Sequence, residues 1–198
     1  MVRIYSGLVL LLVLAFAFDW FPNEIKRPPG VLVADEPEQN PVARPEPWRY
    51  KDYRITPLAD FHLQARVLMT ERYWLGRETQ LSPVDLTVGW RLMSDQAILD
   101  QLDIYRGFRM VYWRPKSGHW PAPHEDITAH VANLHTIPAK DDIDSRLKSI
   151  RPGNLIDLRG YLVLAEGAGG WSWRSSLSRT DEGPGACELV WVDKLAAR

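Results

Sequence analysis

Residues 151–192 read RPGNLIDLRGYLVLAEGAGGWSWRSSLSRTDEGPGACELVWV, and this stretch decides the fold class. It contains three apolar and aromatic runs separated by glycines, around residues 154–165, 171–177 and 187–193. Short runs of this composition that are bounded by Gly or Pro are typical of β-strands. Gly160 interrupts the first run, as a β-bulge or a kink at a barrel corner does. We therefore expect three strands near the C-terminus.

Alternation of apolar and polar residues extends this β pattern toward the N-terminus. Residues 61–73, FHLQARVLMTERY, alternate over the length of a long strand. The apolar residues on its predicted buried face are Phe61, Leu63, Ala65, Val67 and Met69. Residues 108–114, FRMVYWR, are rich in aromatic and β-branched side chains, and they predict a second strand.

Three segments have helical spacing instead. Residues 94–102, SDQAILDQL, begin with Ser94, a residue type that favours helix N-caps. Residues 124–135, HEDITAHVANLH, and 141–150, DDIDSRLKSI, carry apolar residues three and four positions apart. Pro138 favours an extended conformation at the residue before it, so we expect the 124–135 helix to end before that proline.

Strands, short helices and three further strands together suggest a mainly β domain of the α+β class over residues 51–198. A small, partly open barrel of the OB or SH3 type accommodates this order of elements. We place this barrel behind an N-terminal transmembrane helix.

The first 21 residues predict that helix. Residues 4–18 form an uncharged apolar run of 15 residues, which spans about 22 Å as a helix and falls short of a bilayer core of about 30 Å. Trp20 extends the run and provides an interfacial aromatic residue. A cleaved signal peptide is the alternative, because Ala15-Phe16-Ala17 fits a small-x-small cleavage site. We favour an uncleaved anchor that enters the membrane through residues 4–21.

The predicted location follows from this anchor. A short N-terminal apolar run with almost no preceding tail favours a cytoplasmic N-terminus, although Lys26 and Arg27 nearly balance the charge bias. We expect a single-pass protein of the bacterial inner membrane with its main domain in the periplasm. Because Cys187 is the only cysteine, the chain cannot form an intrachain disulfide. The cysteine content therefore gives no evidence for or against an oxidising compartment.

Residues 22–50 predict a proline-rich linker. Seven of the 15 prolines fall in this segment, and it shows little apolar periodicity. Segments of this kind are extended and semi-rigid. We therefore expect a tether that holds the domain away from the membrane, and that can be deleted without unfolding the domain.

Composition excludes one class of partner. The formal net charge is −1, so a nucleic-acid-binding surface is not expected. Nine tryptophans are many for 198 residues, and Trp suits both β-rich cores and protein interfaces. The chain carries no cofactor-binding motif, and we expect no cofactor.

Four strings carry a resemblance to known sequences: LSPVDLTVGWRLMSD (81–95), HVANLHTIPA (130–139), RPGNLIDLRGYLV (151–163) and WSWRSSLSRTDEGPGACELVWV (171–192). In this order the chain resembles a group of uncharacterised bacterial single-pass membrane-anchored proteins over about residues 55–195. The resemblance implies an architecture. It implies no activity and no catalytic residues.

Histidines and acids near residue 130 are the candidate metal ligands. His124, His130 and His135 lie close to Glu125 and Asp126 in the sequence. On one helix, however, residues five apart are rotated by about 500° and face about 140° away from each other. The segment also lacks the His-Glu-x-x-His pattern of zinc hydrolases. We expect packed or hydrogen-bonded histidines and no metal site.

Cys187 is the candidate nucleophile. A catalytic cysteine needs a lowered thiol pKa from a nearby histidine or helix N-terminus. Cys187 begins a predicted strand, so a helix does not assist it. A triad of Cys187, His135 and Asp181 is chemically sensible, and it would make the protein an extracytoplasmic Cys/His-dependent hydrolase or transferase.

We expect instead a non-catalytic, membrane-tethered interaction module that serves as an accessory subunit of a larger membrane protein complex. This hypothesis accounts for the anchor, the linker and the many tryptophans together. Its partner would be an integral membrane protein. The predicted interface residues are Trp74, Trp90 and Trp120 in the domain, and Asp19 and Trp20 near the membrane.

Overall fold

The computed structural model describes residues 24–181, 183 and 185–198. These residues form a mainly β protein with short helices, as expected. Its strands are β1 (Glu38–Pro41), β2 (Trp48–Tyr50), β3 (Tyr53–Arg72), β4 (Val84–Gly89), β5 (Leu102–Gly107), β6 (Met110–Pro115), β7 (Val131–Pro138), β8 (Leu155–Glu166), β9 (Ser172–Arg174) and β10 (Glu188–Ala197). Its helices are α2 (Gln96–Leu99), α3 (His124–Ala129) and α4 (Asp141–Ser149), with 3₁₀ turns η1 (Glu78–Gln80), η2 (Arg91–Ser94) and η3 (Ala168–Gly170).

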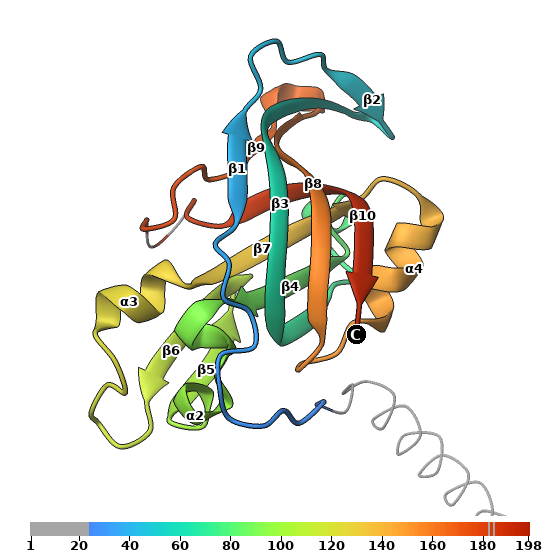
Figure 1. Ribbon diagram of the computed structural model, residues 1–198. Coiled ribbons are helices and arrows are strands. Elements are labelled where there is room, and N and C mark those ends of the chain that lie inside the picture. The colour runs from blue at the N-terminus through green and yellow to red at the C-terminus, as the bar shows by residue number, and fades with distance from the viewer. Residues whose placement is uncertain (1–23, 182, 184) are drawn as a thin grey trace, which may run out of the picture.

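Eight of the described strands form one partly closed sheet (Figure 1). Five of them pair in a cycle, in the order β3, β4, β7, β10, β8 and back to β3. Strands β7 and β10 are parallel, and the other pairs in the cycle are antiparallel. The remaining three strands, β1, β2 and β9, pair at its margins, whereas β5 and β6 form a separate hairpin.

Strand β3 makes the cycle possible because it pairs with two different strands along its length. Residues 54–66 pair with β8, and residues 66–72 pair with β4. The predicted alternation is confirmed, since Phe61, Leu63, Ala65 and Val67 are all buried. Met69 is only half-buried, because the β3–β4 register shifts between Val67 and Met69.

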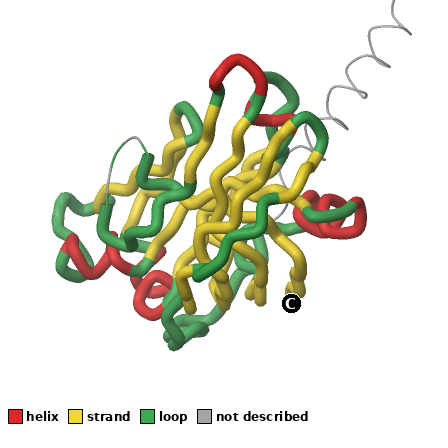
Figure 2. Tube along the Cα trace, turned by 90° about the horizontal axis from the view of Figure 1, so that it is seen from above, coloured by secondary structure: helices red, strands yellow, loops and turns green. Residues whose placement is uncertain are grey.

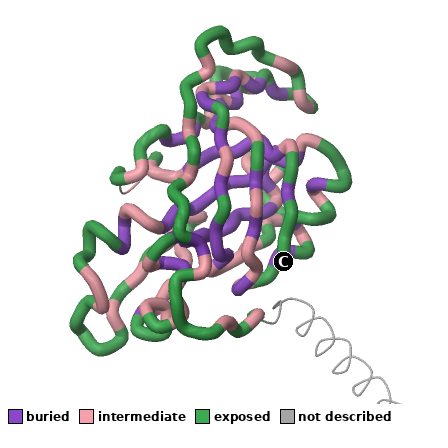
Figure 3. The backbone as a smooth tube through the Cα atoms, in the orientation of Figure 1, coloured by how far each residue is buried: buried purple, intermediate pink, exposed green. Residues whose placement is uncertain are grey.

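The main core lies inside this cycle of strands. Buried residues gather along the strands, and most exposed residues lie in the connections (Figure 3). Helix α4 packs on β7 and β10 through Ile143 and Leu147. Viewed from above, the helices lie around the edge of the strands (Figure 2). Because α4 covers Asp141–Ser149, the helix predicted at residues 141–150 is confirmed.

Gly160 confirms a predicted irregularity of the sheet. A Cβ atom at this position would lie 1.8 Å from the carbonyl oxygen of Trp191, so only glycine allows β8 and β10 to approach this closely. The β10–β8 register shifts between Val192 and Lys194, beside the same glycine.

Two of the predicted helices are wrong in extent. The helix predicted over residues 124–135 ends at Ala129, and residues 131–138 form β7 instead. All eight residues of β7 are buried between β4 and β10, so strand pairing overrides the local helical spacing. The helix predicted over residues 94–102 is reduced to α2, and Asp95 provides its N-cap in place of Ser94.

The described part of the predicted linker is attached to the domain, so our expectation of a free tether is wrong. From Ile25 onward the described chain lies on the domain, and Val33 is buried in the main core. Strands β1 and β2 both pair with β3. Residue 51 is therefore not a structural boundary.

Among the described residues, no helix has both the length and the apolar character needed to cross a membrane. The predicted anchor at residues 1–21, including Asp19 and Trp20, lies outside the described residues.

Candidate functional site

The outer face of β4 and β7 carries polar side chains. Along β4, Leu86 and Val88 enter the core, which leaves Asp85 and Thr87 on the opposite face. On β7, Asn133 and His135 lie directly opposite Thr87 and Asp85. These four polar residues are nonetheless buried, because other segments cover them.

The β5–β6 hairpin is one of these segments, and it reaches the polar face through two arginines. The Nη2 atom of Arg106 donates to Thr87 Oγ1 and Asn133 Oδ1, each at 2.8 Å. Arg109 lies in the hairpin turn, and it donates to Asp85 Oδ1 at 2.5 Å through Nη2 and to Oδ2 at 3.1 Å through Nε. This forked contact fixes the turn against β4.

Asp85 is the centre of this cluster and is fully buried. Its Oδ1 lies 2.9 Å from Nδ1 of His135, and its Oδ2 lies 3.5 Å from Nη1 of Arg106. Burial alone would raise the pKa of Asp85, but the hydrogen bond and charge of His135, followed by those of Arg109, hold it below its usual value. The single carboxylate of Asp85 is thus the shared partner of Arg106, Arg109 and the ionisable ring of His135.

Aromatic rings enclose the cluster. The ring of His135 lies 4.8 Å from that of Trp173 on β9, centroid to centroid. The guanidinium of Arg109 lies 4.2 Å from the ring centroid of Tyr73 and 5.2 Å from that of Trp173. Such stacked cations are stabilised when water is excluded. The cluster therefore ties the hairpin to the loop after β3 and to β9.

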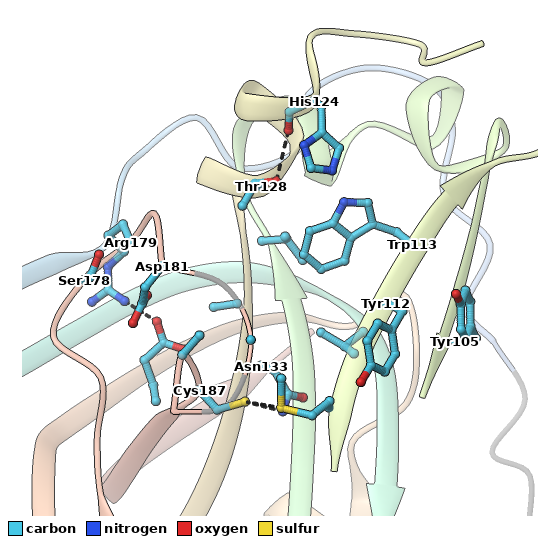
Figure 4. A pocket seen from close by; sticks show the side chains of 17 residues that line it. Tyr105, Tyr112, Trp113, His124, Thr128, Asn133, Ser178, Arg179, Asp181 and Cys187 are labelled. Atoms are coloured by element: carbon cyan, nitrogen blue, oxygen red, sulfur yellow. Dashed lines mark hydrogen bonds and ion pairs between the residues drawn. The ribbon is translucent and has the colours of Figure 1, made fainter. Parts of the chain in front are cut away.

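A cavity of about 340 Å³ lies beside the cluster and shares Asn133 with it. Figure 4 shows Tyr112 and Trp113 of β6 along one wall and Arg179 and Asp181 on the other. Its volume is within the range of small-molecule sites, about 300–1,000 Å³.

Cys187 lies at this cavity with weak polar partners. Its Sγ accepts a hydrogen bond from Asn133 Nδ2 at 3.3 Å and lies 3.9 Å from Sδ of Met110 (Figure 4). Burial raises the pKa of the Cys187 thiol, and the carboxylate of Glu188 adds to this effect, although the Asn133 hydrogen bond opposes it. A raised thiol pKa disfavours the nucleophilic thiolate.

Glu188 follows Cys187 and is buried against Arg179, to which it is hydrogen-bonded and ion-paired. Burial raises the pKa of Glu188 to about 7, and the charge of Arg179 opposes this shift. This wall of the cavity therefore contains a group that titrates near neutrality.

The three residues of the predicted triad have different partners. His135 contacts Asp85 and Trp173, as described above. Asp181 accepts a hydrogen bond from Ser176 Oγ at 2.6 Å. Cys187 lies with Asn133 and Met110.

The other two candidate metal-ligating histidines, His124 and His130, also have different partners. The His124 ring lies 4.6 Å from that of Trp120, and His130 Nε2 lies 3.3 Å from a Glu36 carboxylate oxygen. Within the described ranges, no group of three or more His, Cys, Asp and Glu side chains is arranged to hold a metal ion.

Of the predicted interface tryptophans, Trp74 and Trp120 are exposed by 63% and 40%. The prediction that Trp90 is an interface residue is wrong, because Trp90 is fully buried in the main core. Its Nε1–H donates to Glu36 at 2.6 Å, so both its apolar ring and its polar group are satisfied within the domain. Among the described residues, Phe108 and Leu75 are the most exposed large apolar side chains, ahead of Trp74, and sequence reasoning missed both.

Sequence reasoning also missed the buried cluster. The only local signal was the alternation of polar Asp85 and Thr87 with apolar neighbours, in the string VDLTV. Nothing in the sequence pairs Asp85 with Arg109, 24 residues away. No protein-family model, no curated protein and no solved structure matches this chain.

Proposed function

We propose that the protein is a non-catalytic, membrane-tethered interaction module of OB type, acting as an accessory subunit of a membrane protein complex. The order of the five-strand cycle supports the OB-type assignment, because its second and third strands, β4 and β7, are followed by helix α4 and then by β8 and β10. In OB barrels the outer face of the second and third strands and the adjoining loops carry the binding surface.

The observation that carries the proposal is the exposure of Phe108 at the tip of the inserted β5–β6 hairpin. Its side chain is fully exposed, and neighbouring Arg109 contacts Tyr73, which precedes the exposed Trp74 and Leu75. We name these three exposed apolar residues, Trp74, Leu75 and Phe108, the tip patch. An apolar group that protrudes from the surface gains nothing from the hydrophobic effect until a partner covers it.

Backbone strain strengthens this argument. Gly107 and Met110 pair, so Phe108 and Arg109 form a two-residue turn with φ of +51° and +63°. Such turns favour Asn and Gly, because positive φ is unfavourable for bulky residues. The Arg109 side chain compensates through Asp85, whereas the Phe108 side chain makes no such contact in the described structure. Strain retained without an internal benefit supports a role in binding.

The cavity chemistry supports binding over catalysis. The thiol of Cys187 has a raised pKa, and the contacts of His135 are to Asp85 and Trp173. Alkylation by iodoacetamide near neutral pH separates the two functions: a binding module is expected to react slowly at Cys187, and an activated Cys/His enzyme rapidly.

The proposed location is the bacterial inner membrane, with a cytoplasmic N-terminus and a periplasmic domain. The partner is an integral membrane protein that buries the tip patch. The test is to purify the full chain in mild detergent and quantify copurifying proteins by mass spectrometry, with Phe108→Asn as the variant. Loss of a central aromatic anchor should weaken the complex by about 2 kcal/mol or more, which is roughly thirtyfold.

Val31→Asn is the matched control, since Val31 is an exposed apolar residue outside the tip patch. We expect one integral membrane protein to copurify in fixed proportion with the wild type and with Val31→Asn, and to be lost with Phe108→Asn. Equal recovery with all three chains would rule out the tip patch as the binding surface.

A further inference from the structure

The beginning of the described chain is fixed to one end of the barrel. The amide of Ile25 donates to the carbonyl of Pro152 at 2.8 Å. Arg27 donates to the Gly153 carbonyl through Nε and to the Arg198 carbonyl through Nη2, both at 2.8 Å. Figure 1 shows this end, where the coloured chain begins near the start of β8 and the C-terminus. We call it the basal face, defined by Lys26, Arg27, Arg151–Gly153 and Arg198.

This attachment is built into the loop before β8. A Cβ atom at Gly153 would lie 2.0 Å from the Ile25 carbonyl oxygen, and Gly153 also has a φ of +88°. Both observations require glycine here. Further along, the amide of Gly30 donates to Asp95 at 2.8 Å and Val33 is buried. The chain from Ile25 to Val33 is therefore part of the folded domain.

The position of Ile25 limits the distance between the domain and a membrane anchor. If residues 4–21 span the bilayer, as proposed above, the connection from residue 21 to Ile25 is four residue steps long. Even fully extended, four steps reach at most about 15 Å. The headgroup layer on each side of a bilayer is itself about 5–7 Å thick. The basal face therefore lies no more than about 10 Å beyond the headgroup layer, close enough to dock on it.

The charge of the basal face suits an anionic surface. Lys26, Arg151 and Arg198 are exposed, and Arg27 is half-buried. The acidic residue adjoining them in the chain is Glu24, which is exposed. Each Lys or Arg close to an anionic bilayer strengthens its attraction by about fivefold.

We propose that the basal face rests directly on the bilayer and binds anionic phospholipid headgroups through Lys26, Arg27, Arg151 and Arg198. This inference rests on the proposed anchor and names a second partner of the same module. It fixes the orientation of the domain, with the long axis of β8 leading away from the membrane. Direct contact with the bilayer then replaces the tether that was expected to hold the domain away from the membrane.

Two exposed alanines at opposite ends of this axis provide matched probe positions. Ala197 pairs with Ile156 near the basal start of β8, and Ala168 follows the far end of β8. Both are exposed. Twelve residues of strand separate the two ends, a distance of roughly 40 Å at about 3.3 Å per residue.

The experiment uses the full chain with Cys187→Ser and one new cysteine, Ala197→Cys or Ala168→Cys, labelled with a fluorophore. Each protein is inserted into nanodiscs of phosphatidylcholine with or without phosphatidylglycerol, together with a lipid that carries a headgroup quencher. We expect strong quenching at position 197 and little at 168 in anionic discs. Quenching at 197 should fall in discs without phosphatidylglycerol.

Charge variants test the proposed contacts. Lys26→Gln with Arg151→Gln removes two basal cations and should lower the ratio of docked to undocked domain by about 25-fold in anionic discs. Arg49→Gln with Arg54→Gln removes two exposed cations beside the far end and should change nothing. Circular dichroism checks that each variant is folded.

Two results overturn the inference while leaving the anchor intact. One is equal quenching at positions 197 and 168 in a protein that stays in the disc. The other is quenching at 197 that responds neither to lipid charge nor to loss of Lys26 and Arg151. Release of the full chain from the disc by alkaline carbonate is a different failure, because it overturns the anchor and the docking together.

Discussion

Asp85 determines the charge balance beneath the hairpin. Its carboxylate is fully buried and contacts Arg106, Arg109 and His135. Asp85→Asn leaves the mostly buried side chains of both arginines without a counterion, so we expect a loss of about 3–5 kcal/mol in the free energy of unfolding by urea. Asp103→Asn is the control, because Asp103 pairs with Arg114 on the surface and its loss should cost less than about 1 kcal/mol. Similar losses for the two variants would contradict a structural role for the cluster.

The lowered pKa of Asp85 adds an acid-dependent signature to this comparison. A carboxylate with a depressed pKa in the folded state stabilises the fold above its unfolded pKa of about 4. That contribution is lost as pH falls through the folded pKa. Acid destabilisation should therefore be weaker in Asp85→Asn than in the wild type.

The raised pKa of Glu188 predicts that stability depends on pH in the opposite direction from the effect of Asp85. Burial raises its pKa to about 7, so between about pH 4.5 and 7 the folded state binds more protons than the unfolded state. Stability should then decrease as pH rises through this window, and Glu188→Gln should flatten the slope. Urea unfolding between pH 5 and 7.5 measures it, with exposed Glu166→Gln as the control. An unchanged slope in Glu188→Gln would show that another group titrates.

At the scale of elements, the turn of the β5–β6 hairpin places Arg109, which stabilises the fold, next to Phe108, whose backbone conformation lowers stability. Both turn residues have positive φ, but only Arg109 is anchored to Asp85. Phe108→Asn should relieve strain and raise the free energy of unfolding by about 0.5–1 kcal/mol, since Asn tolerates this backbone conformation. Arg109→Gly should lower it despite the easier backbone, because its contacts with Asp85 are lost. Destabilisation by Phe108→Asn would mean that the ring supports the fold.

The same hairpin shows why binding and stability are separable here. If Phe108→Asn stabilises the domain and abolishes copurification of the partner, loss of the partner cannot be attributed to unfolding. A surface residue that costs stability and supports binding is the expected compromise at a functional position.

At the scale of the whole molecule, the N-terminal segment belongs to the fold. Deleting residues 1–50 removes β1, β2 and the core residue Val33, whereas deleting residues 1–23 removes none of them. We expect the 24–198 fragment to unfold cooperatively in urea. The 51–198 fragment should be less stable by at least about 2 kcal/mol, from the burial of Val33 alone. Equal unfolding midpoints would restore the simple linker hypothesis.

Several elements were predictable because their evidence is local. The alternation of residues 61–67, the Gly-bounded runs that became β8 and β10, and the amphipathic spacing of α4 each lie within a dozen residues. Local spacing reports which face of an element is apolar, and a mainly β domain follows from adding such faces together. The anchor and the tip-patch partner remain predictions.

The tertiary structure alone decided the rest. Residues 131–135 have helical spacing, yet they belong to β7, which pairs with β4 on one side and β10 on the other. Trp90 has a loop-like context and is buried, and the proline-rich segment lies along the sheet. Pairing, burial and the meeting of Asp85 with Arg109 depend on residues far apart in the chain, so their free energies appear in no short stretch of sequence.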